Sequence, residues 1–463
     1  MTVTEVVAGS FRDPSGFLFT RDGILYRQVN AIYRSSYDHL MGSGLYDALV
    51  GEGLLIPHDE EASQPAASDG AYKILRPERL PFVSYPYEWC FSQIKDAGLT
   101  TLRIQKIALA HGMTLKDASA FNIQFRQGRP TLIDTLSFVD YREGQPWVAY
   151  RQFCQHFLAP LALMCHTDCR LGQLFRVFLD GVPLSLASTM LPLRTRLSLP
   201  LLTHLHLHAK TETLFLSRRQ VAKVSGRVSR RGLEGILDSL KSGLRGLRWR
   251  PRGTTWADYY TDTNYSEEAW QDKQRQVERF VREVSPASVW DLGSNTGVFS
   301  RIAASTAERI IAFDLDVAAV EQNYLECVRE RDDRILPLVL DLSNPSPSLG
   351  WANVERPSLF DRGKPDLVLA LALAHHLAIG NNLPLEHIAR FLRGVCPRLL
   401  VEFVPKSDSQ IQRMLASRED IFPDYTRQGF EAAFGQYFRC RESIRLKDSE
   451  RRLYFMDSAA SSA

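Results

Sequence analysis

The stretch of residues 288–300 constrains the fold of this chain more than any other. Its first residues are apolar and suit a buried β-strand that ends at Asp291. Gly293 and Gly297 then allow a tight turn whose backbone comes close to a bound molecule. Residues 298–305 follow with a helical pattern. A strand, a turn and a helix in this order place free backbone N–H groups and a helix N-terminus beside a ligand.

The rest of the sequence after this turn alternates between strand and helix patterns. A helix is predicted over residues 267–284, before the turn. The predicted strands after it are 309–313, 335–340, 366–372 and 398–404, and the predicted helices are 317–329, 383–394 and 407–417. Residues 438–446 and 451–456 form a predicted closing hairpin. This order predicts an α/β, Rossmann-like domain with a mostly parallel sheet, helices on both faces and an antiparallel hairpin at the end.

Ligands of such sheets bind at the carboxyl ends of the strands. The turn lacks the middle glycine of a dinucleotide-binding loop, because Asn295 stands there. Asp291 precedes the turn and would repel a pyrophosphate, but it suits a cationic amine. Asp314 ends the next strand, where a carboxylate accepts hydrogen bonds from two ribose hydroxyls. A ligand that has both an amino-acid end and a nucleoside end is S-adenosylmethionine.

The segment from Asp291 to Gly297 resembles the first motif of class I S-adenosylmethionine-dependent methyltransferases. The resemblance covers residues 255–458, and Leu373–Leu377 is similar to an apolar-His-His-apolar segment of that family. It implies S-adenosylmethionine as cofactor, with Asp341 near the adenine. The implied cofactor-binding residues are Asp291, Gly293, Asn295, Gly297, Asp314 and Asp341. The whole chain is also similar to bacterial proteins related to a nodulation-associated methyltransferase.

The methyltransferase resemblance implies an in-line SN2 transfer in which the protein aligns the acceptor and removes its proton where needed. Candidate catalytic residues are His375, His376 and Glu402. Both histidines are expected at the end of the fourth strand. Because adjacent residues of a strand point in opposite directions, at most one of them would face the site. The alternatives are that the histidines line the adenine pocket or cap the next helix, and that Glu402 is paired within the sheet region.

The N-terminal third contains two further patterns. Residues 17–29 read as a β-hairpin around an Asp-Gly turn, and residues 91–110 as an amphipathic helix. Asp117, Asn122 and Asp134 then follow, separated by two short strands and a turn. Oxygen ligands of this kind suit Mg²⁺ and nucleotide phosphates.

This second pattern resembles the catalytic and metal loops of the protein-kinase-like fold, in its small-molecule phosphotransferase branch. The resemblance implies that Asp117 handles the proton of an acceptor hydroxyl and that Asn122 and Asp134 hold Mg²⁺. The pattern departs from that family, since Leu115 replaces a histidine and no glycine-rich loop occurs near residues 17–29. The alternatives are a degenerate domain that binds a partner or substrate, or polar residues that only cap turns.

Composition and charge set the class and the boundaries. The 463 residues are 44% hydrophobic and 24% charged, as in ordinary soluble proteins. The chain shows no signal peptide, no expected membrane span and seven scattered cysteines, which predicts a cytoplasmic protein with reduced thiols. A net charge of +3 does not indicate a nucleic-acid partner for the whole chain.

Residues 217–252 carry eleven Lys and Arg against two acidic residues, with leucines at helical spacing between them. Such a basic amphipathic segment is a linker or contacts an anionic partner. We therefore expect three parts: an N-terminal α+β domain over 1–216 with the degenerate kinase-like character as a hypothesis, a basic linker and amphipathic helix over 217–254, and a methyltransferase domain over 255–463.

The predicted activity is methyl transfer to an unidentified acceptor, more in keeping with a small molecule than with nucleic acid, and the N-terminal domain is a candidate for selecting it. Two alternatives are a bifunctional or degenerate phosphotransferase–methyltransferase fusion and a non-catalytic, methyltransferase-like scaffold.

Overall fold

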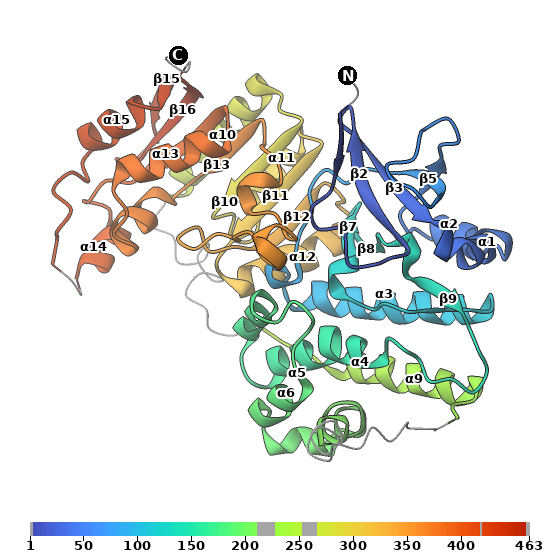
Figure 1. The fold of residues 1–463 in the computed structure, drawn as a ribbon. Coiled ribbons are helices and arrows are strands. Elements are labelled where there is room, and N and C mark those ends of the chain that lie inside the picture. Colours follow the sequence, from blue (N-terminus) through green and yellow to red (C-terminus); the bar gives the residue numbers. More distant parts are fainter. Residues whose placement is uncertain (1–2, 211–226, 252–265, 417–418, 460–463) are drawn as a thin grey trace. The chain divides into compact units, whose positions relative to one another are not determined.

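The structure is a computed structural model of the full chain. It describes residues 3–210, 227–251, 266–416 and 419–459. The chain divides into two compact units (Figure 1). The first comprises Met1–Arg250 together with Ser348–Pro357, and the second comprises Pro251–Pro347 together with Ser358–Ala463.

The second unit is built on a seven-stranded sheet in the order β12-β11-β10-β13-β14-β16-β15. The strands are β10 (Ser288–Leu292), β11 (Arg309–Asp314), β12 (Ile335–Val339), β13 (Leu367–Ala370), β14 (Arg398–Phe403), β15 (Phe438–Arg445) and β16 (Arg452–Ser458). β10 to β14 pair in parallel, whereas β16 is antiparallel to both β14 and β15. The predicted Rossmann-like fold with an antiparallel closing hairpin is confirmed.

Helices between the strands complete this unit. They are α10 (Glu267–Val284), α11 (Val298–Ala304), α12 (Val317–Glu330), α13 (Leu385–Val395), α14 (Ser409–Leu415) and α15 (Arg427–Gly435), with the short helices η10 (Leu359–Asp361) and η11 (His376–Gly380). α10 begins at Ser266, whose hydroxyl accepts from the Ala269 amide, and its apolar stripe enters the core of the sheet. The Phe280 ring of α10 lies 5.1 Å from that of Phe455. α10 is therefore an integral layer of the fold.

The first unit begins with a five-stranded antiparallel sheet in the order β1-β2-β3-β5-β4. Its strands are β1 (Thr4–Val6), β2 (Gly16–Arg21), β3 (Ile24–Asn30), β4 (His58–Glu60) and β5 (Ala71–Pro77). β2 and β3 form the hairpin predicted over 17–29. Asp22 and Gly23 both have positive φ, 50° and 79°, which is the backbone conformation that an Asp-Gly turn favours.

Helices and two small strand pairs follow this sheet. The elements are η1 (Ala31–Tyr33), α1 (Arg34–Gly42), α2 (Leu45–Gly51), η2 (Pro86–Glu88), α3 (Phe91–Ala110), β6 (Met113–Leu115), η3 (Ala120–Asn122), β7 (Ile123–Arg126), β8 (Arg129–Leu132), η4 (Thr135–Ser137), β9 (Phe138–Asp140), α4 (Tyr150–Phe153), η5 (Cys154–Leu158), α5 (Ala159–His166), η6 (Cys169–Arg176), α6 (Leu184–Met190), η7 (Leu193–Leu197), α7 (Leu199–Leu201), η8 (Leu202–Leu207), α9 (Arg230–Gly246) and η9 (Trp351–Asn353). β6 pairs with β9 and β7 with β8, both antiparallel. α3 has the bounds predicted from its periodicity.

Helix α9 belongs to the core of the first unit, which differs from its predicted role in a linker over 217–254. Leu237 and Leu244 are fully buried, and α9 packs on α3. The helices approach closely because α3 carries Gly98, where a Cβ atom would lie 2.7 Å from the Leu244 side chain. The arginines of α9 lie on the exposed face of that helix. Residues 211–226 and 252–265, which include both ends of the basic segment, lie outside the described residues.

The packing of α9 makes a stability prediction. Leu237→Ala removes a fully buried side chain from α9 and should lower the free energy of unfolding by about 2–5 kcal/mol, measured by urea unfolding of the full chain. Ser242→Ala, on the exposed face of the same helix, is the control and should change it by less than about 0.5 kcal/mol. Equal stability of the two variants would contradict the placement of α9 in the core.

Candidate functional site

The turn after β10 has the tight backbone that its glycines predict. Gly293 and Gly297 have φ of 77° and 83°, and Asn295 between them has φ of 51°. A Cβ atom at Gly297 would lie 2.4 Å from the Asn323 side-chain oxygen, so only glycine fits there. The amides of Gly293 and Ser294 donate to the Phe313 carbonyl at 2.9 and 3.0 Å, which fixes the turn to the end of β11. The turn is held close to the neighbouring strand, as a ligand cradle requires.

Asp291 and Asp314 lie at the ends of β10 and β11, which are hydrogen-bonded neighbours. Asp291 is buried, and the Ser300 hydroxyl donates to it at 2.6 Å. Burial raises its pKa to about 7, and the Asp314 charge adds to the rise, while Ser300 and Lys273 oppose it. Burial also raises the pKa of Asp314, to about 6. Two carboxyls near each other in a buried site hold protons unusually well, and a ligand that brings a cation or hydroxyl donors would favour their ionised form.

Asp314 also closes the glycine turn. Its two oxygens accept from the Asn295 amide at 2.7 Å and the Asp316 amide at 2.8 Å. Asp341, after β12, accepts from the amide and the hydroxyl of Ser343 through one oxygen, Oδ1. The structure thus places Asp291, Asp314 and Asp341 after three adjacent strands, as the sequence predicted.

The chemistry of the turn fits a ligand with polar groups. The Ser294 hydroxyl is buried and has no hydrogen-bond partner among the described residues. An unpaired polar atom in a buried cradle costs free energy that a bound ligand would recover. The residues implied by the methyltransferase resemblance therefore fit S-adenosylmethionine.

The two candidate histidines do not lie on a strand. β13 ends at Ala370, and His375 has helical φ and ψ at the start of η11. The rings of His375 and His376 lie 4.0 Å apart, so the expectation that they point in opposite directions is wrong. His375 is buried, and its Nδ1 has no hydrogen-bond partner among the described residues. Burial, then the charges of Arg451 and Lys273 together with His376, lowers the pKa of His375 well below its ordinary value.

Glu402 lies on β14 inside a chain of buried charges. Its Oε2 lies 2.7 Å from Lys273 Nζ, and its Oε1 lies 3.7 Å from Arg451. Arg451 in turn contacts Asp408 at 2.7 Å. Lys273 and Arg451 were not predicted as site residues. A signal for Lys273 was available, because it occupies a position in the apolar stripe of α10 between Trp270 and Val277.

The first unit brings the kinase-like candidates together. Asp117 is hydrogen-bonded by the Ser119 amide at 2.8 Å and by the Asn122 side chain. Burial raises the pKa of Asp117, and the nearby charge of Asp134 contributes to the rise. The three residues lie in the loops around β7 and β8, so the sequence pattern does correspond to one cluster.

An arginine of the sheet neutralises this cluster. Arg27, on β3, forms an ion pair and hydrogen bond with Asp134 Oδ1, and the Ser137 hydroxyl donates to Oδ2 at 2.6 Å. Burial acts to raise the pKa of Asp134, but the Arg27 charge and these hydrogen bonds outweigh it and lower the pKa. Both carboxylate oxygens that a metal would use already accept from protein donors. Arg27 was not predicted from the sequence.

Residues 348–357 form a small hairpin within the first unit, although the sequence on both sides belongs to the second. Leu349 and Arg356 pair across it. Glu355 accepts from Arg12 at 3.0 and 3.3 Å, and its backbone lies so close to Gly9 that a Cβ atom there would be 2.5 Å from the Glu355 oxygen. The loop between β1 and β2 is therefore packed on this hairpin.

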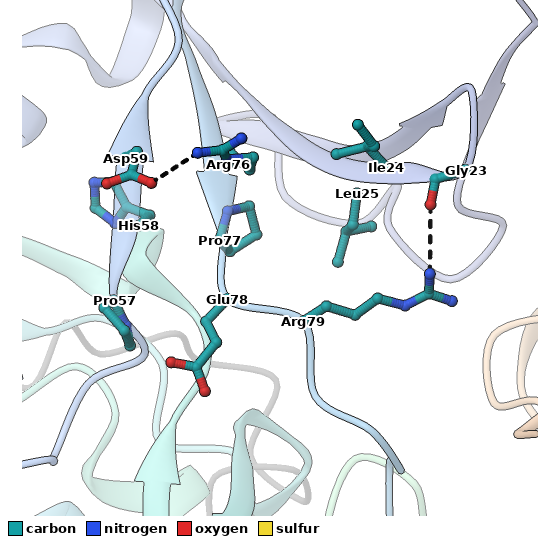
Figure 2. Close-up of a pocket in the computed structure, with 10 residues that line it drawn as sticks. All are labelled: Gly23, Ile24, Leu25, Pro57, His58, Asp59, Arg76, Pro77, Glu78 and Arg79. Atoms are coloured by element: carbon teal, nitrogen blue, oxygen red, sulfur yellow. Dashed lines mark hydrogen bonds and ion pairs between the residues drawn. The ribbon is translucent and has the colours of Figure 1, made fainter.

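A cavity of about 480 Å³ also lies in the first unit, at one edge of its sheet. Its lining residues are Gly23, Ile24, Leu25, Pro57, His58, Asp59, Arg76, Pro77, Glu78 and Arg79 (Figure 2). Its charged groups are committed to the protein, since Arg76 contacts Asp59 at 3.2 Å and Arg79 donates to the Gly23 carbonyl at 3.4 Å. None of the ten residues is a site candidate from the sequence.

The described residues contain no group of three or more His, Cys, Asp or Glu side chains arranged to hold a metal ion. In the same residues, no helix combines the length and apolarity needed to cross a membrane.

The chain is 38% identical over 458 residues to nodulation protein NoeA of Rhizobium meliloti (strain 1021), covering 97% of this chain and 95% of that protein. The chain belongs to the NoeA family. The similarity of this NoeA-family chain to its relative spans nearly the full length of both proteins. No protein-family model matches it.

Solved structures resemble part of this NoeA-family chain. The N-methyltransferase NodS of Bradyrhizobium japonicum WM9 is 11% identical, with a TM-score of 0.31, over 42% of this chain and 99% of that one. Magnesium protoporphyrin IX methyltransferase of Synechocystis PCC 6803, with bound S-adenosylhomocysteine, is 16% identical, with a TM-score of 0.30, over 43% and 91%.

The ion pair of Arg27 makes a second prediction. Arg27→Met leaves the Asp134 carboxylate in a largely buried site without its cation, and should lower the free energy of unfolding by about 3–5 kcal/mol in urea. Arg27→Met/Asp134→Asn removes both charges and should recover most of that loss. If the single variant is as stable as the wild type, Arg27 does not neutralise this carboxyl.

The buried carboxyl of Asp291 makes a prediction about pH. Its pKa is about 7 in the folded protein and near 4 when unfolded, so the folded state holds a proton that the unfolded state loses between these values. This group therefore destabilises the fold by about 1.4 kcal/mol per pH unit as pH rises through that window. Asp291→Asn cannot ionise. Its stability relative to wild type should increase from pH 4.5 to pH 7 and then stay level, measured by calorimetry.

Asp272→Asn serves as the matched control, because Asp272 is also buried but lies on α10 and accepts from the Lys447 amide. A constant stability difference between Asp291→Asn and wild type across the window would show that Asp291 titrates normally.

Proposed function

We propose that the second unit transfers a methyl group from S-adenosylmethionine to an acceptor. The observation that carries this proposal is the pairing of Asp291 and Asp314 at the ends of adjacent parallel strands, with a glycine turn between them that lacks the dinucleotide pattern. A buried carboxylate at each end of the turn suits a ligand with an ammonium group at one end and a ribose at the other.

Each residue of the turn has a role in binding under this proposal. Asp291 receives the ammonium group of the amino-acid end. The Ser294 hydroxyl, which has no partner among the described residues, donates to the carboxylate of the cofactor's amino-acid end. Asp314 accepts from the ribose hydroxyls. The closely approaching backbone at Gly293 and the glycine required at Gly297 keep side chains out of the cradle. Asn295 holds the turn to Asp314, and Asp341 lies on the adenine side.

When bound, S-adenosylmethionine supplies a sulfonium-activated methyl group, and displacement in line by a nucleophile forms the new bond to carbon while the carbon–sulfur bond breaks. The protein must align the acceptor and accept the proton that it loses. His375 is the best placed of the candidates, since its Nδ1 is buried and without a partner among the described residues. Because its pKa is low, His375 is neutral and able to accept a hydrogen bond from the acceptor at neutral pH.

Glu402 is a weaker candidate for a base than the sequence indicated. Its carboxylate is already engaged by Lys273 and lies near Arg451, so it is better suited to hold these groups in place than to remove a proton. The ring of His376 lies against that of His375 at an interplanar angle of 41° and would orient it.

For the first unit we propose a binding role, the selection of a small-molecule acceptor. The engagement of Asp134 by Arg27 supports binding over phosphotransfer, because the carboxylate that would hold Mg²⁺ is neutralised from within the chain. A phosphotransferase fusion and a non-catalytic scaffold are the two alternatives that the experiment below separates.

Calorimetric titration with S-adenosylmethionine tests the cofactor. We expect wild type to bind it and S-adenosylhomocysteine, and not NAD. Asp291→Ala and Asp314→Ala should each weaken binding by about 1–3 kcal/mol, since each leaves a charged or hydroxyl group of the ligand unmet. Asp366→Ala is the control, because Asp366 holds the opposite end of β10 at the Ser288 amide and should leave affinity unchanged.

Two further measurements distinguish the alternatives. Incubation with methyl-labelled S-adenosylmethionine and cell extract should label a small molecule, and binding without any labelled product would indicate a scaffold. Binding of Mg-ATP that disappears in Asp134→Ala would indicate the phosphotransferase. Binding of NAD but of neither adenosyl ligand would reject the proposed function.

A further inference from the structure

A buried lysine reaches the candidate site from α10. Lys273 is 3% exposed, and its Nζ lies 2.7 Å from Glu402 Oε2 on β14. The same Nζ lies 4.8 Å from the centre of the Phe299 ring on α11. The next residue along α11, Ser300, donates to Asp291 at 2.6 Å. Lys273 therefore contacts Phe299, and the neighbouring Ser300 binds Asp291, the carboxylate that is proposed to receive the cofactor's ammonium group.

Burying this chain of charged side chains costs much desolvation free energy. Lys273, Glu402 and Arg451 are all almost fully buried, and Asp408 extends the chain of charges at 2.7 Å from Arg451. Removing charges from water costs several kcal/mol for each ion, and well-packed apolar residues are often as stable as a buried ion pair. Fold stability alone therefore gives little reason to place a lysine in the apolar stripe of α10.

The charge of Lys273 acts on two groups at the strand ends. Asp291 is faced by Ser300 from α11, by Asp314 from β11 and by Lys273 from α10, and of these only Lys273 is a cation. Its charge lowers the pKa of Asp291 against the effects of burial and Asp314. It also contributes to the low pKa of His375, together with Arg451 and His376.

We infer that Lys273 is a positioning residue of the methyl-transfer site, which anchors Glu402 beneath the strand ends and keeps Asp291 in the carboxylate form that receives the cofactor's ammonium group. This rests on the proposed function. The residue touches neither cofactor nor acceptor in this account, and it acts through Asp291 and Glu402.

The test is the affinity for S-adenosylmethionine as a function of pH, measured by calorimetry on the full chain from pH 6 to pH 9. In Lys273→Met the pKa of Asp291 rises. As the pH is lowered, the loss of affinity for S-adenosylmethionine should therefore begin at a higher pH than in wild type. Because the pKa of Asp291 is about 7 in wild type, a rise of one pH unit in that pKa makes the ratio of Kd values, variant to wild type, about ninefold at pH 6, roughly fivefold at neutral pH and near one at pH 9. The ligand's own amino group titrates alike in both measurements, so the ratio isolates the protein.

Companion variants separate this effect from instability. Lys273→Met leaves Glu402 buried without its nearest cation, and Lys273→Met/Glu402→Gln removes both charges. The double variant should regain thermal stability and still show a pH-dependent ratio, because it too lacks the cation that lowers the pKa of Asp291. Lys273→Arg should restore wild-type behaviour. Arg282→Met, on the exposed face of α10, is the control and should give a ratio of one at every pH.

The outcomes are distinct. A ratio that changes with pH in the single and double variants supports the inference. A ratio that is the same at every pH, whether one or larger, overturns it and assigns Lys273 to the fold alone, while wild-type binding leaves the proposed function standing. If wild type binds S-adenosylmethionine at no pH, the proposed function fails, and the inference falls with it.

Discussion

The carboxyls of Asp291 and Asp314 repel each other across the ends of two hydrogen-bonded strands, and the rest of the second unit compensates for that repulsion. Burial raises the pKa of both groups, and at Asp291 the charge of Asp314 adds to the rise. The compensation consists of fixed donors, namely the Ser300 hydroxyl and the amides of Asn295 and Asp316. A ligand that brings an ammonium and two hydroxyls would replace strained proton binding with direct pairing.

The same constraint explains why so many charges lie under the sheet. An isolated pair of carboxyls would take up protons and lose its attraction for a cationic ligand. A nearby cation opposes this proton uptake, but a lysine with no other partner would itself form an ion pair with the carboxylate. The 2.7 Å contact with Glu402 holds Lys273 off Asp291, so its field reaches the carboxyl while its hydrogen bond goes elsewhere. Arg451 and Asp408 then fix Glu402 on its other side.

Much of the second unit was predictable from sequence because its signals are local. α10 has the predicted bounds and β10 ends one residue beyond Asp291, since apolar runs and helical stripes are read within a short length of chain. Asp291 and Asp314 could be placed together because successive parallel strands end at one edge of a sheet. The placement of His375 at a strand end was wrong because β13 ends at Ala370, earlier than its apolar run indicates, and the chain enters η11 instead.

What the sequence does not contain is the identity of distant partners. Lys273 and Glu402, like Arg27 and Asp134, are more than one hundred residues apart, and no spacing rule connects them. The packing of α9 on α3 likewise depends on Gly98, which has no special signal of its own. These long-range contacts decide whether a carboxyl is a base, a metal ligand or a neutralised structural group.

In both units a resemblance identifies the carboxyls, and a cation from elsewhere in the chain sets what they can do. At Asp134 the guanidinium bonds directly to the carboxylate and takes the place of an external ligand. Near Asp291, the ammonium group of Lys273 is bound by Glu402 instead, so the Asp291 carboxylate can still accept a hydrogen bond from a ligand. The difference lies in which acid receives the hydrogen bond of the cation. It is the physical reason why we propose cofactor chemistry for the second unit and binding for the first.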